Sequence, residues 1–243
     1  DPRAALAALR EAARHDPATD RDHLDTVRIS LASAEQRAGR AGRLRPGRCT
    51  RLWTRLEHNA LEASFAPEIL RTDLARVALD VLAFHPGPLQ SFPFFERPSD
   101  GALARATSLL SMLGALDPSG ERLSERGRKL ASLPLQPRTG ALLLEGARLG
   151  HPGESALLAA ILEDDRCWPR EEARTSTDSD LALFAERRLP EEVRRAARDL
   201  ERHVRAPGGL PEVDDETARR RALIAAFPDR VCKRRRKGEP DAA

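Results

Sequence analysis

The octet QRAGRAGR, which runs from Gln36 to Arg43, limits the local fold more than any other part of the chain. On a helix, Gln36, Arg40 and Arg43 stand at positions i, i+4 and i+7, so one face presents an amide and two guanidinium groups. Planar guanidinium groups bind phosphate oxygens in bidentate pairs. The spacing therefore predicts a helix face that contacts phosphate groups.

The small residues of the octet favour the same interpretation. Inside a helix, Gly39 and Gly42 each cost about 1 kcal/mol relative to Ala. Glycine leaves the backbone unobstructed, which suits the close approach of a phosphate chain or of another domain. The alternative is that Ser33 and Gln36 form only a capping box and that the arginines are a solvated face. The complete octet favours phosphate binding over this alternative.

The residues around the octet predict a small α/β unit. The Ala- and Arg-rich start of the chain is predicted to be helical, and apolar residues alternate along Thr26–Leu31, which is the period of a strand. Ser33 offers an N-cap for the helix that carries the octet. Pro46–Gly47 is expected to end that helix, and the short apolar stretch Cys49–Trp53 predicts a second strand. The order is that of a β-α-β fragment.

Downstream of Pro67 the apolar spacing is that of helices, and one stretch predicts a winged helix. Apolar residues stand three and four apart along Leu103–Leu113, and Gly114 is placed to end that helix. Asp117–Gly120 has the residue preferences of a type I turn between two short apolar stretches, and Ser124 can cap the next helix. Helices, a small hairpin and a further helix are the parts of a winged helix.

The remaining sequence predicts a helical bundle. A helix beyond Pro137 is closed by Gly150, and Pro152 opens another, so the two form an αα-hairpin. Asp178 and Pro190 are expected to start two further helices. The fold class is therefore mainly α with a small α/β part.

Composition limits the function classes. The 243 residues are enough for one or two domains, and 40% hydrophobic with 33% charged residues fits a soluble protein. No apolar run approaches membrane-spanning length, and the start lacks the order of a secretory signal. Three dispersed cysteines and six scattered histidines show no metal-ligand spacing, so no metal site and a cytoplasmic location are expected. Because the single Met is Met112, we expect the chain to be a piece of a longer polypeptide.

Two basic segments are candidates for nucleic-acid binding. The segment after Ser124 offers cations for phosphates but no Asn or Gln for base edges, so phosphate contact is favoured over base readout. The run Lys233–Lys237 could bind RNA phosphates without sequence preference, although a solvated end is the simpler interpretation. The candidate residues are Arg126, Arg128, Lys129, Lys233, Arg234 and Arg235.

The octet resembles motif VI of superfamily 2 helicases, and its surroundings are similar to the HrpB-type DEAH-box RNA helicases. Thr26–Ser30 and Arg51–Trp53 carry the resemblance beside the octet, and Leu133–Arg138 and Ala226–Val231 carry it downstream. The similarity covers most of the chain from Arg14 to Lys237. Motif VI is its specific signal, and the other segments corroborate it.

The resemblance implies a fold and a set of roles. In this family motif VI lies on the second RecA-like domain and faces ATP bound by the first, so Gln36 would orient the attacking water. Arg40 and Arg43 would contact the γ-phosphate, with Arg43 as the arginine finger and Gly39 beside the nucleotide. Mg²⁺ would be held by the first RecA-like domain, and the downstream helices would close over single-stranded RNA.

The resemblance also implies four parts. Residues 1–58 would be the end of RecA-like domain 2, residues 59–135 the winged helix, residues 136–205 a ratchet-like bundle, and residues 206–243 the start of a carboxyl-terminal region with a basic tail. HrpB-type proteins continue well beyond the position of Lys237, so a further domain is expected to follow.

Two helicase motifs are missing from the sequence. It contains no G-x-x-x-x-G-K-[ST] phosphate loop and no D-E-x-H motif. We therefore expect the chain alone not to hydrolyse ATP. The expected partners are ATP, single-stranded or structured RNA and, as a separate chain, the missing amino-terminal helicase domain, with no membrane. The alternative is a non-catalytic module that binds RNA or a helicase.

Overall fold

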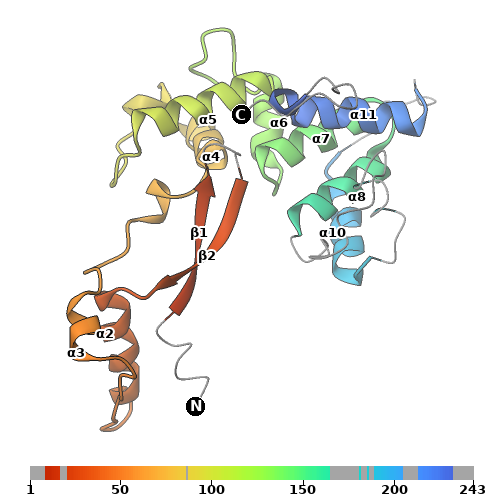
Figure 1. Ribbon diagram of the computed structural model, residues 1–243. Helices are drawn as coiled ribbons and strands as arrows, with labels where there is room; N and C mark the ends of the chain where they lie inside the picture. Colours follow the sequence, from red (N-terminus) through yellow and green to blue (C-terminus); the bar gives the residue numbers. More distant parts are fainter. Residues whose placement is uncertain are drawn as a thin grey trace, which may run out of the picture. The chain divides into compact units, whose positions relative to one another are not determined.

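The computed structural model describes residues 9–16, 21–85, 87–164, 181, 185, 189–204 and 213–231 (Figure 1). The chain divides into two compact units, residues 1–74 with 93–103 and residues 75–92 with 104–243. Its described part is mainly α-helical with one small sheet, as predicted. Of the helix expected after Asp178, only Leu181 and Ala185 are described, and both are helical. The run Lys233–Lys237 lies outside the described residues. No helix within the described ranges has the length and apolarity to cross a membrane.

An antiparallel hairpin begins the first unit. Strand β1 (Leu9–Asp16) pairs with β2 (Arg21–Arg28), and Leu9 lies opposite Arg28 at one end of the register. The prediction of a helical start is wrong for β1, because pairing with β2 overrides the helix preference of its alanines. The strand expected over Thr26–Leu31 exists, but it ends at Arg28.

Helix α2 (Leu31–Gly39) begins earlier than the sequence predicted. Its N-cap is Ser30, whose side chain accepts a hydrogen bond from the amide of Ser33 at 3.2 Å, so the predicted cap at Ser33 is wrong. The amides of Leu31 and Ala32 donate to the carbonyls of Glu62 and Ala63 at 2.8 and 3.0 Å. These bonds satisfy donors that a helix start otherwise leaves open.

The predicted second strand is also wrong, because Cys49–Trp53 forms no strand. Arg51 within it donates to the Glu35 carboxylate at 2.6 Å and lies 3.1 Å from the Nε2 atom of His58. The segment is thus tied to α2 and α3 (Arg55–Asn59) by side chains in place of backbone pairing. The first unit therefore contains a hairpin and helices, and it has no β-α-β fragment within its described residues.

The other elements follow in chain order. They are η2 (Arg40–Gly42), η3 (Glu68–Leu70), α4 (Ala75–Phe84), η4 (Leu89–Ser91), α5 (Asp100–Met112), α6 (Glu125–Ser132), α7 (Pro137–Arg148), α8 (Pro152–Glu163), α10 (Glu191–Glu201), α11 (Asp215–Ala226) and η6 (Pro228–Arg230).

The wing between α5 and α6 has the turn that the sequence predicted. Gly114 has φ +69°, a conformation that favours glycine, and follows the end of α5. Leu116 bridges Leu123, and the Gly120 amide donates to the Asp117 carbonyl at 2.9 Å, which closes the turn. A hydrogen bond from Ser119 lowers the pKa of Asp117.

The core of the second unit lies among the bundle helices. Helix α8 packs on α7 and α10, and α11 packs on α7 (Figure 1). The side chains of Leu142, Leu143, Leu158 and Ile161 are at most 1% exposed. Truncating such a Leu to Ala costs about 2–5 kcal/mol, so these contacts dominate the stability of the bundle.

A charged contact joins the start of α7 to η6, the 3-10 turn that follows α11. Arg138 donates through both terminal nitrogens to the Asp229 carboxylate at 2.6 and 2.7 Å, and its guanidinium lies 5.4 Å from the Phe227 ring centre. The hydrogen bonds from Arg138 lower the pKa of Asp229. Because the pKa is lowered, the carboxylate stays ionised and the contact persists to lower pH than for an unpaired Asp.

Candidate functional site

The octet predicted to contact phosphate lies across the end of α2 and the 3-10 turn η2. Gln36 is in α2, Arg40 is its C-cap and the first residue of η2, and Arg43 follows with helical dihedrals of φ −68° and ψ −42°. All three side chains are exposed. In the described part of the chain, no hydrogen bond or ion pair engages any of the three.

The change from α-helix to 3-10 turn keeps the three positions on one side. Residues four apart on an α-helix share a face, which places Arg40 beside Gln36. Side chains three apart in a 3-10 turn eclipse one another, which brings Arg43 into line with Arg40. The helix was predicted to continue to Pro46–Gly47, so its shorter length is a correction that preserves the shared face.

The glycines of the octet face open space. A Cβ atom added to Gly39 or to Gly42 would meet nothing within 4 Å. A Cβ atom on Gly47 would lie 1.8 Å from the carbonyl oxygen of Ala41, which is an impossible contact. Gly47 is therefore required where the chain folds back on η2, whereas packing inside the first unit does not require Gly39 or Gly42.

This contrast gives a prediction for the isolated chain. Gly39→Ala and Gly42→Ala should each stabilise the octet by about 1 kcal/mol, because Ala is the better helix former. Gly47→Ala should destabilise the same segment, since the Ala41 carbonyl must move. Amide hydrogen exchange over residues 31–42 measures both effects. Faster exchange in Gly39→Ala would show that glycine is needed there for the fold itself.

Ion pairs and hydrogen bonds position the segment that follows the octet. Thr54 and Glu57 form a complete capping box at the start of α3, with the Thr54 amide donating to Glu57 at 2.8 Å. Hydrogen bonds from the Thr54 backbone and side chain are the largest cause of the lowered pKa of Glu57, and Arg28 adds to it. The loop that follows Arg43 is therefore fixed at its Thr54 end by these contacts.

Arg126, a predicted nucleic-acid contact, is engaged inside the second unit. Its Nε atom donates to the carbonyl of Leu113 at 2.9 Å, and Nη2 donates to that of Ala141 at 3.4 Å. Its Nη1 atom lies 3.7 Å from Glu145. The guanidinium thus joins the end of α5 to α7, and binding a phosphate would have to compete with these partners.

Arg128 and Lys129 are more accessible. Arg128 is exposed but donates to the Leu123 carbonyl at 3.0 Å, and Lys129 pairs with Glu125 at 2.9 Å one turn earlier. An exposed i, i+4 pair contributes only about 0.3–0.5 kcal/mol, so it can exchange for a phosphate. The other predicted contacts, Lys233, Arg234 and Arg235, lie outside the described residues.

Two arrangements of side chains were not predicted from the sequence. Arg76 on α4 donates to the carbonyls of Leu133 and Leu135, both at 2.7 Å. His151, Glu154 and Asp215 bring ligand atoms within 4.8 Å of one another, although 61 residues separate Glu154 from Asp215. In both groups, some of the interacting residues are too far apart in the sequence for a spacing pattern to predict the contact.

The acidic members of the second group have partners within the protein. Arg219 lies 2.6 Å from the Glu154 carboxylate, and the Asp215 carboxylate is 2.9 Å from the Nδ1 atom of His151. The Nε2 atom of His151 is 2.9 Å from the Val213 carbonyl. The group therefore joins the starts of α8 and α11.

Comparison with known proteins defines the class. Residues 106–135 match the helicase associated domain (HA2), winged-helix. This match covers the carboxyl-terminal part of α5, the wing and α6. The chain thus shares a domain with helicases that carry a helicase-associated winged helix.

Comparison with individual proteins identifies a narrower group of similar proteins. The chain is 36% identical over 228 residues to the ATP-dependent RNA helicase HrpB of Escherichia coli, which covers 94% of the chain and 26% of HrpB. A crystal structure of the Escherichia coli DEAH/RHA helicase HrpB matches with a TM-score of 0.74 and 34% identity, over 94% of the chain and 28% of that protein. A crystal structure of the E. coli DExH-box NTPase HrpB matches with a TM-score of 0.71, 34% identity and coverage of 95% and 27%.

By sequence and by fold, the chain is similar to a portion of the HrpB-type DEAH-box helicases. It spans about a quarter of the length of the relatives that it matches.

Proposed function

We propose that this chain is part of an ATP-dependent RNA helicase that couples ATP hydrolysis to translocation on RNA or to its unwinding. In this proposal Gln36, Arg40 and Arg43 contact the nucleotide, with Arg43 as the arginine finger and Gln36 orienting the attacking water. Gly39 allows the phosphates close access, and Mg²⁺ is held by a first RecA-like domain outside this chain.

The observation that carries the proposal is the exposed face of the octet. Two guanidinium groups and an amide share it, and in the described part of the chain nothing else engages them. Arginines that neutralise charge on a γ-phosphoryl group must reach a ligand outside their own domain, which requires such exposure. The open space above Gly39 and Gly42 suits that approach.

In the second unit, the winged helix and the bundle would support RNA. Lys129 and Arg128 are the accessible cations of the predicted set, and Arg126 would act by holding α5, α6 and α7 together. RNA contact through phosphates makes affinity depend on salt concentration and little on sequence.

The test is ATP hydrolysis by two polypeptides. The isolated chain should release no phosphate above background, because it has no phosphate loop and no D-E-x-H motif. A polypeptide extended through the upstream coding sequence should hydrolyse ATP, with stimulation by RNA. RNA-stimulated turnover by the isolated chain would contradict the proposal. An upstream sequence without a phosphate loop would favour a non-catalytic RNA-binding module.

A further inference from the structure

Helix α2, which carries the first part of the octet, is held near both ends by the chain that follows the octet. At its start, the amides of Leu31 and Ala32 donate to the carbonyls of residues 62 and 63 at 2.8 and 3.0 Å. Beyond its end, the chain folds back so closely that a Cβ atom on Gly47 would lie 1.8 Å from the carbonyl oxygen of Ala41. Backbone contacts therefore fix the place of α2 and η2 within the first unit.

A side-chain contact holds the middle of α2. Arg51 donates through Nη2 to the Glu35 carboxylate at 2.6 Å, and its Nη1 atom lies 3.1 Å from Nε2 of His58 on α3. We name these three residues the Arg51 cluster. The side chains of Arg51 and Glu35 are 29% and 61% exposed, so the ion pair is partly shielded from solvent. One guanidinium group therefore joins α2 to α3.

The position of Glu35 on α2 connects the Arg51 cluster to the octet. Glu35 directly precedes Gln36, and consecutive residues of an α-helix project about 100° apart around its axis. A bond that holds Glu35 toward Arg51 therefore also fixes the direction in which Gln36 projects. Arg40 shares the face of Gln36, so a rotation of α2 would move both side chains together.

Charge gives Arg51 a second effect on the octet. An unpaired carboxylate at Glu35, next to Gln36, would repel phosphate groups, and the guanidinium of Arg51 offsets this charge. Arg40 and Arg43 differ from Arg51, because no hydrogen bond or ion pair engages them in the part of the chain that the structure describes. Two arginines are therefore open to a ligand, and the third is engaged within the first unit.

We infer that Arg51 is a positioning residue for the octet: by holding Glu35, it keeps α2 in the orientation that directs Gln36, Arg40 and Arg43 toward the nucleotide. The nucleotide rests on the proposed function. The ordering of the octet by Arg51 does not, because every contact of the Arg51 cluster lies within the first unit. The two parts can therefore be measured separately.

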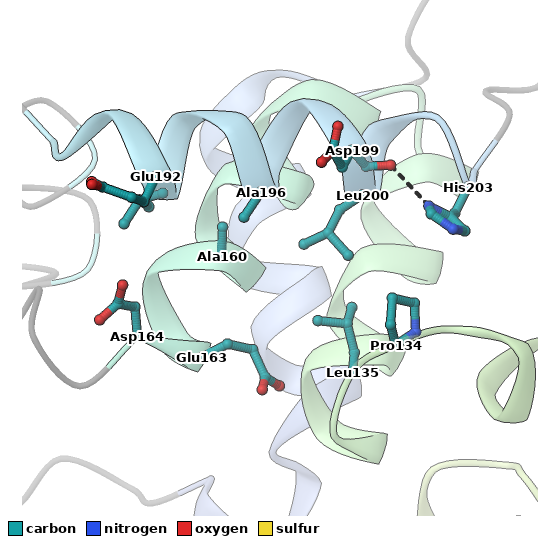
Figure 2. Close-up of a pocket in the computed structure, with 11 residues that line it drawn as sticks. Pro134, Leu135, Ala160, Glu163, Asp164, Glu192, Ala196, Asp199, Leu200 and His203 are labelled. Carbon is teal, nitrogen blue, oxygen red and sulfur yellow. Dashed lines mark hydrogen bonds between the residues drawn. The ribbon is translucent and has the colours of Figure 1, made fainter.

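A helix of the second unit supplies the control. Helix α10 borders a pocket of about 670 Å³ between α8 and α10, and Figure 2 shows its carboxylate side chains. They belong to Glu163, Asp164, Glu192 and Asp199. Among the described lining residues there is no lysine or arginine, so this region does not attract phosphate groups.

Arg198 of α10 forms the matched ion pair. It lies 2.7 Å from the Glu191 carboxylate, nearly the distance between Arg51 and Glu35. Arg198→Ala therefore removes a similar Arg–Glu pair from a helix that has no predicted role toward the nucleotide.

The first measurement is amide hydrogen exchange of the isolated chain over residues 35–42. Arg51→Ala should speed exchange there by about 10-fold, because the charged hydrogen bond to Glu35 is lost. Arg51→Lys should have a smaller effect, since an ammonium group can pair with Glu35 but cannot reproduce the fork that also reaches His58. Arg198→Ala should leave exchange in these residues unchanged. A circular dichroism melt confirms that each variant is folded.

The second measurement is RNA-stimulated ATP hydrolysis by the complete helicase. Arg51→Ala should lower kcat by about 10- to 100-fold, because a misplacement of about 1 Å in groups that contact the transition state can cost about 10²-fold. KM for ATP should change by less than about 3-fold, since the loss falls on transition-state contacts. Arg51→Lys should recover part of kcat. A residue that only stabilised the fold would lower Tm without lowering kcat of the folded enzyme.

A double-mutant cycle tests whether Arg51 acts through Glu35. If it does, the variant Glu35→Ala/Arg51→Ala should have a kcat no lower than that of Arg51→Ala, because the second substitution removes a partner that is already unpaired. Losses that multiply would mean that the two residues act independently, which would contradict the inference.

Each outcome decides the inference. Faster exchange together with a lower kcat in Arg51→Ala supports it. Exchange equal to that of Arg198→Ala overturns it, and so does an unchanged kcat in a variant with faster exchange. Failure of the proposed function has a different signature, because the unaltered complete helicase would then hydrolyse no ATP. The exchange result alone would in that case decide whether Arg51 orders the octet.

Discussion

Replacing Arg43 by Ala in the complete helicase should lower kcat for RNA-stimulated ATP hydrolysis by roughly 10³- to 10⁵-fold, the contribution of an arginine finger. The side chain is exposed at the end of the octet and aligned with Arg40 by the 3-10 turn. Its contact with the γ-phosphoryl group would strengthen as charge develops, so the loss should appear in kcat. Affinity for ATP and for RNA should change little.

The neighbouring Arg45 provides the control. It is also exposed, and it lies on the loop after the octet, outside α2 and η2. Arg45→Ala should retain nearly the full rate of hydrolysis. Arg43→Lys should recover little activity, because an ammonium group cannot make the bidentate contact of a guanidinium. A turnover rate for Arg43→Ala within a few-fold of the unaltered enzyme would refute the finger assignment.

The second large effect concerns stability. Arg76→Ala should destabilise the second unit by about 2–4 kcal/mol, because it leaves partly buried carbonyl groups without this donor. Arg76 donates to the carbonyls of Leu133 and Leu135 at 2.7 Å and reaches that of Ala131 at 3.4 Å. It also pairs with Asp80 at 2.9 Å. The guanidinium therefore joins α4 to the end of α6.

Thermal unfolding of the isolated chain measures this effect. A loss of 2–4 kcal/mol in a domain of this size lowers Tm by roughly 4–16 °C. Arg76→Lys should be intermediate, since one ammonium group cannot reach all the carbonyls. Arg105→Ala on the exposed side of α5 is the control and should change stability by less than about 0.5 kcal/mol. A Tm for Arg76→Ala equal to that of Arg105→Ala would contradict the role of Arg76.

Local signals in the sequence predicted the second unit well. Gly114, Ser124 and Pro152 each mark a helix end by their own backbone chemistry, and the structure has helices α5, α6 and α8 ending or beginning there. Such features depend on residues a few positions apart. The role of the octet face stays a prediction, and the structure shows that Gln36, Arg40 and Arg43 are exposed.

Predictions failed where distant residues decide the local structure. Leu9–Asp16 looks helical by composition but pairs with a strand. Cys49–Trp53 looks like a strand, but side-chain contacts of Arg51 with Glu35 and His58 hold it without backbone pairing. The internal bonds of Arg126 to Ala141 and Leu113 also join residues far apart in the sequence, while its contact with nucleic acid stays a prediction. None of these partners could be identified from periodicity.

The hydrogen bonds of Arg126 and the tight packing of Gly127 at the start of α6 also limit which substitutions the winged helix can accept during evolution. In helix-turn-helix proteins, the first residues of the recognition helix read the bases. Here Arg126 is bonded to two carbonyls, and a Cβ atom on Gly127 would lie 2.0 Å from the Ala115 carbonyl oxygen. Substitutions at either position would damage the fold before they could create base contacts. Selection for new nucleic-acid specificity can therefore act only on the outward positions, such as Glu125, Arg128 and Lys129.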